Sequence, residues 1–355
     1  MTAPAPAIES KLQQQSSQRL PGWSTWVILV ASFGLGALVT VVAGGFHITG
    51  AAIIGLLLFL VAVYLISYLY EGPRWAADRL AAALVVAAFV LVMVPLLSLI
   101  TLVVVDGSRY FDWMFVSTDM TGVYGAMTHG GALHAIIGTL LVTGIASLIS
   151  IPLGIFTAVY LVEYRGGRIG KVLTFLVDVM TGIPSIVAGL FAFSLFFILA
   201  SPSYKAGVIG SVALAVLMTP VVVRGTEEML KLVPNELREA SYALGVPKWL
   251  TIVKVVLRTA IAGITTSVMI AIARVAGETA PLLITVGIVA GVNWNAFDGR
   301  IATLPVFVYR QYAQGGDANL GRAWAGALAL ILIVMILNLA ARLVSRYFSP
   351  KGLSH

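Results

Sequence analysis

Cysteine is absent from this chain and charge is scarce, and each absence narrows what the protein can be. No cysteine occurs among 355 residues, which excludes disulfides and thiolate chemistry. Charged residues make up 10% of the chain and hydrophobic residues 59%, and the mean hydropathy is +0.99. Because a soluble domain cannot bury so much apolar surface, the expected solvent is a lipid bilayer.

Motifs typical of enzymes are missing as well. The nearest run to a G-x-x-x-x-G-K-[ST] phosphate loop, GGRIGKV, has Arg165 and Val172 at two required positions, so ATP must be hydrolysed by another chain. The four histidines lack the spacing of metal ligands, and no nucleophile elbow occurs. We therefore predict a non-enzymatic chain that binds no metal or cofactor of its own. Basic residues are not interleaved with aromatics on one face, so no nucleic acid partner is expected.

Eight apolar runs approach or exceed the roughly 20 residues that a helix needs to cross a bilayer. They are long and continuous and lack the alternation of barrel strands, so helices are expected. The sequence thus predicts an all-α integral membrane protein with about eight transmembrane helices. The runs cover residues 26–45, 51–70, 81–105, 133–162, 172–200, 207–223, 260–290 and 323–345. The fourth and seventh runs are longer than one span needs, so each is expected to be tilted, broken or extended beyond the lipid.

The distribution of positive charge predicts the orientation in a cell membrane. With the N-terminus inside, cytoplasmic segments hold 16 of the 22 Lys and Arg residues, the outer segments hold five, and Arg274 is left within a span. This asymmetry favours cytoplasmic placement of both termini. The polar residues 1–25 are expected to form a disordered tail without a cleavable signal, and residues 350–355 a second short tail.

The longest predicted cytoplasmic loop, residues 224–258, is amphipathic and mixed in charge. Asn235 suits the N-cap of a short helix from Glu236, and Gly245, closely followed by Pro247, suits its left-handed end. A second amphipathic helix is expected from Lys248 into the membrane. Such a projecting element can dock on a partner protein, although a helix lying on lipid headgroups is the alternative.

This loop resembles the EAA loop of ABC-importer permeases. EASYALG followed by VPKWLTIVKVVLR has Glu239, Ala240 and Gly245 in register, while Ser241 replaces the second alanine and Arg258 replaces a proline. The resemblance implies that residues 239–241 and Gly245 couple the chain to an ATPase subunit.

Further runs narrow the resemblance to the A-type permeases of phosphate-specific ABC importers. It covers about residue 80 to the C-terminus, and implies a six-span permease core at 80–349 preceded by two accessory spans at 26–79. It also implies a second, C-type permease, a pair of ATPase subunits that bind ATP and Mg, and an extracytoplasmic phosphate-binding protein. The similar runs are DVMTGIPSIVAG (178–189), VVVRGTEEMLKLVP (221–234), ARVAGETAPLL (273–283) and TLPVFVYRQYA (303–313).

Two ions lie within the seventh apolar run, where a lone charge costs about 2.5–3.5 kcal/mol on insertion scales. Arg274 and Glu278 are four residues apart, so on one helix they would share a face and pair. Gly277 would let a backbone or ligand approach, and Pro281 would kink the helix. Arg224, near the inner end of the sixth run, offers a second cation at another depth.

Two interpretations of these ions stay open. In the first, Arg274 and Arg224 line an anion path, because a guanidinium meets a tetrahedral oxyanion with paired, charge-assisted hydrogen bonds. Glu278 would then neutralise Arg274 between passages. In the second, Arg274 and Glu278 form a buried ion pair that only staples helices or the permease pair together.

The run TGIPSIVAG is expected to form a bent, closely packed helix shaped by Gly182 and Pro184. Ser185 is open to a hydrogen bond with the passing anion or to a packing role alone. Asp178, one turn into this span, is expected to pair with a basic residue such as Lys171.

Two alternatives concern the function itself. Sulfate and molybdate are tetrahedral oxyanions like phosphate, so only the motif resemblance favours phosphate. A stand-alone secondary anion transporter or channel would need no docking loop, and the sequence has no paired inverted repeat with two broken segments.

Overall fold

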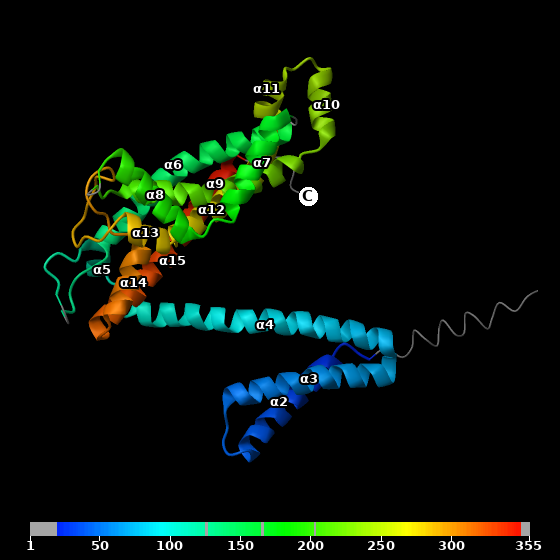
Figure 1. Ribbon diagram of the computed structural model, residues 1–355. Coiled ribbons are helices and arrows are strands. Elements are labelled where there is room, and N and C mark those ends of the chain that lie inside the picture. Colours follow the sequence, from blue (N-terminus) through cyan, green and yellow to red (C-terminus); the bar gives the residue numbers. More distant parts are fainter. Residues whose placement is uncertain (1–19, 125–126, 165–166, 202–203, 349–355) are drawn as a thin grey trace, which may run out of the picture. The chain divides into compact units, whose positions relative to one another are not determined.

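The computed structural model describes residues 20–124, 127–164, 167–201 and 204–348, with the backbone alone for 344–348. Within these ranges every regular element is a helix (Figure 1). Contacts divide the chain into two compact units, Met1–Ile100 and Thr101–His355. The predicted tails lie mostly outside the described residues, as does Arg165.

The first unit is a helical hairpin followed by the start of a long helix. It contains α2 (Ser24–Val42), α3 (Ile48–Glu71) and the first part of α4 (Pro73–Ser108). α2 and α3 pack closely through glycine, since a Cβ on Gly36 would lie only 2.6 Å from the backbone nitrogen of Gly55. Close approach of this kind suits helices in lipid, where packing rather than hydrophobicity holds them together.

A buried carboxylate ties one end of this hairpin to α4. The side chain of Glu71 is 1% exposed and pairs with Arg79, whose Nη2 lies 2.8 Å from its Oε1. Glu71 also accepts hydrogen bonds from the Ser67 hydroxyl and from the backbone N–H of Leu20. Because these donors satisfy the carboxylate, it can be buried without a large desolvation cost.

The second unit contains the rest of α4 and all later helices, arranged around α9. α9 contacts α6, α7, α8, α12 and α13. The helices of this unit are α5 (Trp113–Ser117), α6 (Leu133–Glu163), α7 (Gly167–Thr181), α8 (Ser185–Leu199), α9 (Gly207–Lys231), α10 (Asn235–Ala243), α11 (Lys248–Thr251), the π-helix η1 (Ile252–Val256), α12 (Leu257–Ala276), α13 (Ala280–Thr285), α14 (Leu304–Gln314) and α15 (Asp317–Phe348).

Small side chains let α6 and α9 pack closely at the centre of this unit. A Cβ on Gly154 of α6 would lie 2.7 Å from Val222 of α9. One turn away, the Ser150 hydroxyl donates a hydrogen bond to the carbonyl oxygen of Ala215. The contact therefore combines close packing with a polar bond that needs no water.

The predicted number of about eight membrane spans is confirmed, but one of the spans consists of two helices that meet at an angle. Seven described helices are long and apolar enough to cross a membrane, and an eighth span results if α7 and α8 count as one. These two helices meet at 110° across Gly182, Ile183 and Pro184. The predicted bend in the fifth run is thus confirmed, but the run is two helices, because proline cannot continue the hydrogen-bond ladder of α7.

The overlong seventh apolar run, 260–290, is broken, which is one of the three forms predicted for it. α12 ends at Ala276, and α13 covers only six residues before a non-helical stretch that reaches α14. Hydropathy alone does not show where α12 ends. Backbone that lies inside the protein can satisfy its polar groups without being helical, so an apolar sequence need not continue as a helix.

The predicted helix–turn–helix in the 224–258 region is confirmed in outline. α10 is followed by a left-handed Gly245 (φ +74°), and α11 begins at Lys248. The predicted N-cap is wrong by one position, because Pro234 holds the cap and Asn235 is the first helical residue. α9 extends to Lys231, well beyond the predicted end of the sixth run.

Gly138 offers a test of the packing around α6. A Cβ there would lie 1.9 Å from the backbone oxygen of Ala302, whereas Gly144 of the same helix has nothing within 4 Å. We expect Gly138→Ala to lower stability by about 1–3 kcal/mol through overpacking. Gly144→Ala should be neutral or stabilising by up to about 1 kcal/mol. Thermal unfolding of the detergent-solubilised protein measures both, and equal unfolding temperatures would contradict this packing.

Candidate functional site

A cavity of ≈ 340 Å³ lies between α7, α9 and α12, and we call it the central cavity. Both arginines singled out in the sequence for an anion path, Arg224 and Arg274, line it. Its other polar lining comes from Thr181, Glu228 and Ser267. The cavity therefore combines two guanidinium groups with hydroxyl groups and one carboxylate.

A glycine contact between α9 and α12 brings the two arginines to one cavity. Gly225 follows Arg224 in α9, and a Cβ there would lie 2.6 Å from Cβ and Oγ of Ser267 in α12. Arg274 lies seven residues after Ser267, two turns further along the same helix. Any side chain larger than hydrogen at position 225 would separate these helices.

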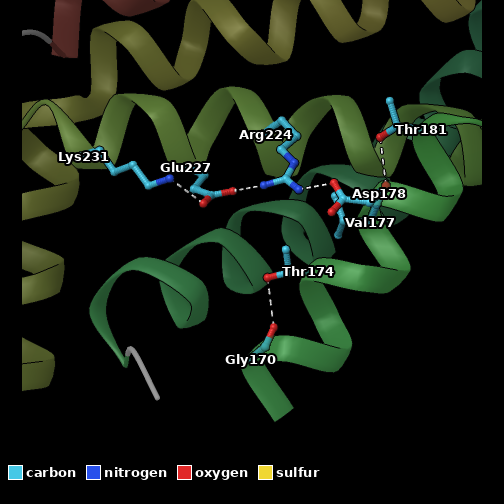
Figure 2. Close-up of polar contacts among 8 residues, drawn as sticks. All are labelled: Gly170, Thr174, Val177, Asp178, Thr181, Arg224, Glu227 and Lys231. Carbon is cyan, nitrogen blue, oxygen red and sulfur yellow. Dashed lines mark hydrogen bonds and ion pairs between the residues drawn. The ribbon is translucent and has the colours of Figure 1, made fainter. Parts of the chain in front are cut away.

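Arg224 is neutralised by two carboxylates. Its Nη2 donates to Asp178 of α7, and its Nη1 donates to Glu227 at 2.8 Å (Figure 2). Lys231 binds the other oxygen of Glu227 at 2.7 Å, so two cations and two anions alternate along this row. The predicted pairing of Asp178 with a basic residue is therefore confirmed, but the partner is Arg224, 46 positions away in sequence, and not the suggested Lys171.

Arg274 has no such compensation. It lies in the last turn of α12 with an exposed side chain, and no ion pair or side-chain hydrogen bond of the described residues involves it. Glu278 lies beyond the helix end, where its backbone N–H donates to the oxygen of Val275. The predicted Arg274–Glu278 pair is wrong, because a shared face requires a helix that continues past Ala276.

Gly277 and Pro281 lie at the break between α12 and α13. Gly277 caps α12, and a Cβ on it would meet only the Arg274 backbone oxygen at 3.8 Å, so no described group packs closely there and its role toward a ligand stays a prediction. Pro281 stands in the first turn of α13, a position that proline favours, and starts this helix rather than kinking α12. The close approach occurs instead at Gly189, where a Cβ would lie 2.7 Å from Cα of Pro281.

The remaining residues of the predicted path lie elsewhere. Ser185 is the first residue of α8 and is half-buried, and neither it nor Glu278 lines the central cavity. Sequence reasoning missed Glu228, although its spacing of four from Arg224 places both on one helix face. Thr181 and Ser267 carried no signal, because hydroxyl groups are common in membrane helices.

The predicted coupling element projects from one end of the unit (Figure 1). No residue of α10 is buried, and Glu239 and Ala240 are exposed. Ser241 shares a hydrogen bond of 2.8 Å with Thr251, which links α10 to α11. The coupling element thus exposes the surface of α10, while the hydrogen bond between Ser241 and Thr251 holds α10 against α11.

Arg238 anchors this element, a role that sequence reasoning missed. Its Nη2 contacts Glu163 at the end of α6 at 2.8 Å and the carbonyl oxygen of Leu230 at 3.0 Å. Its Nη1 donates to the carbonyl oxygen of Val233 at 2.6 Å. Because both side chains of the ion pair are largely buried, removing one partner would leave an uncompensated charge.

Comparison with known proteins identifies the family of the chain. The family described as "Binding-protein-dependent transport system inner membrane component" matches residues 150–351, more than half of the chain. The chain belongs to this family. As a member it is a multi-pass membrane transport permease, which agrees with the spans described above. No group of three or more His, Asp or Glu side chains within the described ranges is arranged to hold a metal ion.

A curated relative resembles most of this permease. "Phosphate transport system permease protein PstA 1" of Mycobacterium tuberculosis (strain CDC 1551 / Oshkosh) is 45% identical over 263 residues, which cover 72% of this chain and 84% of the relative. The relative therefore shares nearly its whole length with this permease.

Two solved structures share the fold. The MetNI methionine ABC transporter in an inward-facing conformation matches with a TM-score of 0.52 at 19% identity, over 61% of this chain and 96% of that one. A bacterial alginate ABC transporter in complex with an alginate pentasaccharide-bound periplasmic protein matches with a TM-score of 0.53 at 16% identity, over 78% and 97%. At these identities the likeness extends to the fold alone.

Proposed function

We propose that this chain is a permease subunit of an ATP-driven importer of inorganic phosphate, with Arg274 and Arg224 on the anion path. The observation that carries the proposal is the uncompensated Arg274 guanidinium on the central cavity, next to a second guanidinium. The identity of 45% with a protein named as a phosphate permease supports phosphate over other tetrahedral oxyanions.

The two arginines suit two different steps of passage. Arg274 carries a free, planar donor fork that can bind an oxyanion in a bidentate manner. Arg224 already holds Asp178, whose side chain is 59% exposed and can be displaced, and Glu227, which is 12% exposed and stays in place. An anion is therefore attracted strongly by Arg274. Arg224 attracts it more weakly, because the carboxylates of Asp178 and Glu227 compete for the guanidinium, so the anion can bind and still be released.

The second interpretation is that an Arg274–Glu278 ion pair holds helices or the two permeases together. Within this chain the two side chains form no ion pair. Arg274 could instead bind a carboxylate of a second permease, and the experiment below distinguishes this role from a place on the anion path. Roles for Ser185 and Glu278 in anion passage stay predictions from sequence, since neither side chain lines the central cavity.

Several partners follow from this function. ATP and Mg are bound by a pair of separate ATPase subunits, which receive α10 with residues 239–241 and Gly245 at the contact. A second, C-type permease completes the path, and an extracytoplasmic phosphate-binding protein delivers the anion. The α10 end of the unit faces the cytoplasm, as do both termini, in a cell membrane. The exposed surface of α10 supports this docking.

Substitutions at Arg274 test the anion path. Arg274→Gln removes the charge-assisted bond, worth about 1.5–3 kcal/mol, so uptake should fall by roughly 10-fold or more. Arg274→Lys keeps the charge but loses the fork, so uptake should fall less. Arg342→Gln is the matched control, because this exposed arginine of α15 lies outside the central cavity and outside the coupling element.

The measurement is uptake of labelled phosphate, normalised to assembled complex. Loss of the complex from the membrane in Arg274→Gln would instead indicate a staple to the second permease. An assembled Arg274→Gln complex with the uptake of Arg342→Gln would remove Arg274 from the path. Uptake of sulfate or molybdate in place of phosphate would keep the path and change its substrate.

Substitutions at Gly245 test the coupling element. Its φ of +74° lies in the left-handed region, which a β-branched residue adopts only with strain, whereas asparagine tolerates it. We expect Gly245→Val to uncouple ATP hydrolysis from uptake, and Gly245→Asn to retain most coupling. Both rates are measured in the reconstituted complex at matched amounts. Normal coupling in the valine variant would argue against a role for this turn.

A truncation tests whether the first two spans are accessory. A chain that begins at Gly72 keeps α4 whole, since this helix starts at Pro73. It loses the partners of Arg79, but this side chain lies near the helix start and can extend toward lipid headgroups. We expect the shortened chain to insert, assemble and transport. Membrane insertion without assembly would show that α2 or α3 belongs to the subunit interface.

A further inference from the structure

A second cavity, of ≈ 490 Å³, lies at the end of the 101–355 unit away from α10 (Figure 1), and we call it the distal cavity. It is enclosed by the start of α6, by α14, by the start of α15 and by residues near 120 and 290. Its volume is in the range of ligand pockets, about 300–1,000 Å³. Neither arginine of the central cavity takes part in it.

Arg322 brings a buried positive charge to this cavity. It is 2% exposed, and all its hydrogen bonds go to neutral oxygens: the carbonyls of Met127 (2.7 Å) and His129 (3.1 Å) and the side-chain amides of Gln311 and Asn319. No carboxylate of the described residues pairs with it. These contacts fix the guanidinium in place but leave its charge uncompensated, which is costly for a buried cation.

His134 adds a polar group that lacks a partner. Its ring is 4% exposed and lies edge-on to Phe307, with 5.5 Å between ring centroids. Its Nδ1 is buried and makes no hydrogen bond in the described part of the chain, although the ring lines the cavity. A turn of the ring toward the cavity would let this nitrogen bond to a ligand oxygen. It donates or accepts according to its tautomer, so an oxyanion that carries both O⁻ and OH can satisfy it in either form.

Arg310 supplies the free donors. It lines the same cavity from α14, its side chain is exposed, and no hydrogen bond or ion pair is recorded for it within the described ranges. Its whole guanidinium fork is thus open to a ligand, while Arg322 contributes mainly fixed charge. Two guanidinium groups with no carboxylate among the lining residues form a positive pocket.

We infer that the distal cavity is a second oxyanion-binding site, in which Arg310 grips the anion, Arg322 supplies buried charge and His134 bonds to a ligand oxygen. This inference rests on the proposed function, where the site would hold phosphate on the side opposite the coupling element, before it reaches Arg274. The chemistry is that of a partly protonated tetrahedral oxyanion.

The carboxylate of Asp119 does not compensate the charge of the distal cavity. Asp119 is half-buried and outside the cavity lining, and its Oδ1 accepts the backbone N–H of Thr121 at 2.9 Å. Burial acts to raise the pKa of Asp119, but hydrogen bonds from Thr121 and Val292 oppose it, and the pKa lies below its ordinary value. The carboxylate is therefore charged and bound to its own loop.

Arginine modification in the assembled complex tests the site without relying on transport. In nanodiscs, p-hydroxyphenylglyoxal reacts with accessible guanidinium groups, and peptide mass spectrometry gives the rate at each arginine. We expect inorganic phosphate, but not chloride at equal ionic strength, to slow modification of Arg310 at least threefold. Arg300, which is exposed and outside the cavity lining, is the internal control and should not change. His134→Phe keeps the ring contact and should raise the phosphate concentration for half-protection severalfold.

The outcomes separate this site from the proposed function. Protection of Arg310 that persists in Arg274→Gln supports a distinct site, even where uptake is lost. Protection by sulfate without protection by phosphate keeps the site and counts against phosphate as the substrate. Equal rates at Arg310 with and without any oxyanion would overturn the inference. So would an Arg310 that the reagent does not reach in the phosphate-free complex, because a closed cavity admits no anion.

Discussion

The close packing of α9 against its neighbours is the constraint on which the second unit depends. This helix contacts five others, and glycine permits the approach at several of them. Gly154 of α6 accommodates Val222, and Gly225 of α9 accommodates Ser267 of α12. Without the second contact, Arg224 and Arg274 would line separate surfaces. Small residues thus set the geometry of the charged groups, although they carry no charge themselves.

The arginines of this unit differ in how their charge is compensated, and the difference is informative. Arg224 has two carboxylates, and Arg238 has one carboxylate together with backbone carbonyls. Arg322 has neutral oxygens alone, and Arg274 has no side-chain partner in the described part of the chain. Fully paired arginines hold helices together. Uncompensated ones, which cost free energy in the resting protein, are those that an anion would stabilise.

Local patterns predicted local features well. The left-handed turn at Gly245, the start of α11 and the bend before Ser185 all follow from glycine and proline at fixed offsets. What failed depended on distant contacts. The end of α12 at Ala276 separates Arg274 from Glu278, and the next helix, α13, packs on α8 from a distant part of the sequence. The partners Asp178–Arg224 and Glu163–Arg238 are 46 and 75 positions apart, beyond any helical spacing.

The position of Arg274 in the last turn of α12 has a consequence for its resting charge. Aligned peptide dipoles give a helix C-terminus roughly half a negative charge, worth about 0.3–1 kcal/mol to a nearby cation. The guanidinium is therefore steadied by fixed backbone groups and not by a carboxylate. Fixed dipoles do not titrate and do not leave, so an anion that binds Arg274, as proposed, would displace no carboxylate from it. A dependence of this step on pH would then reflect the ionisation of the anion or of Glu228, the one carboxylate among the described residues that line the same cavity.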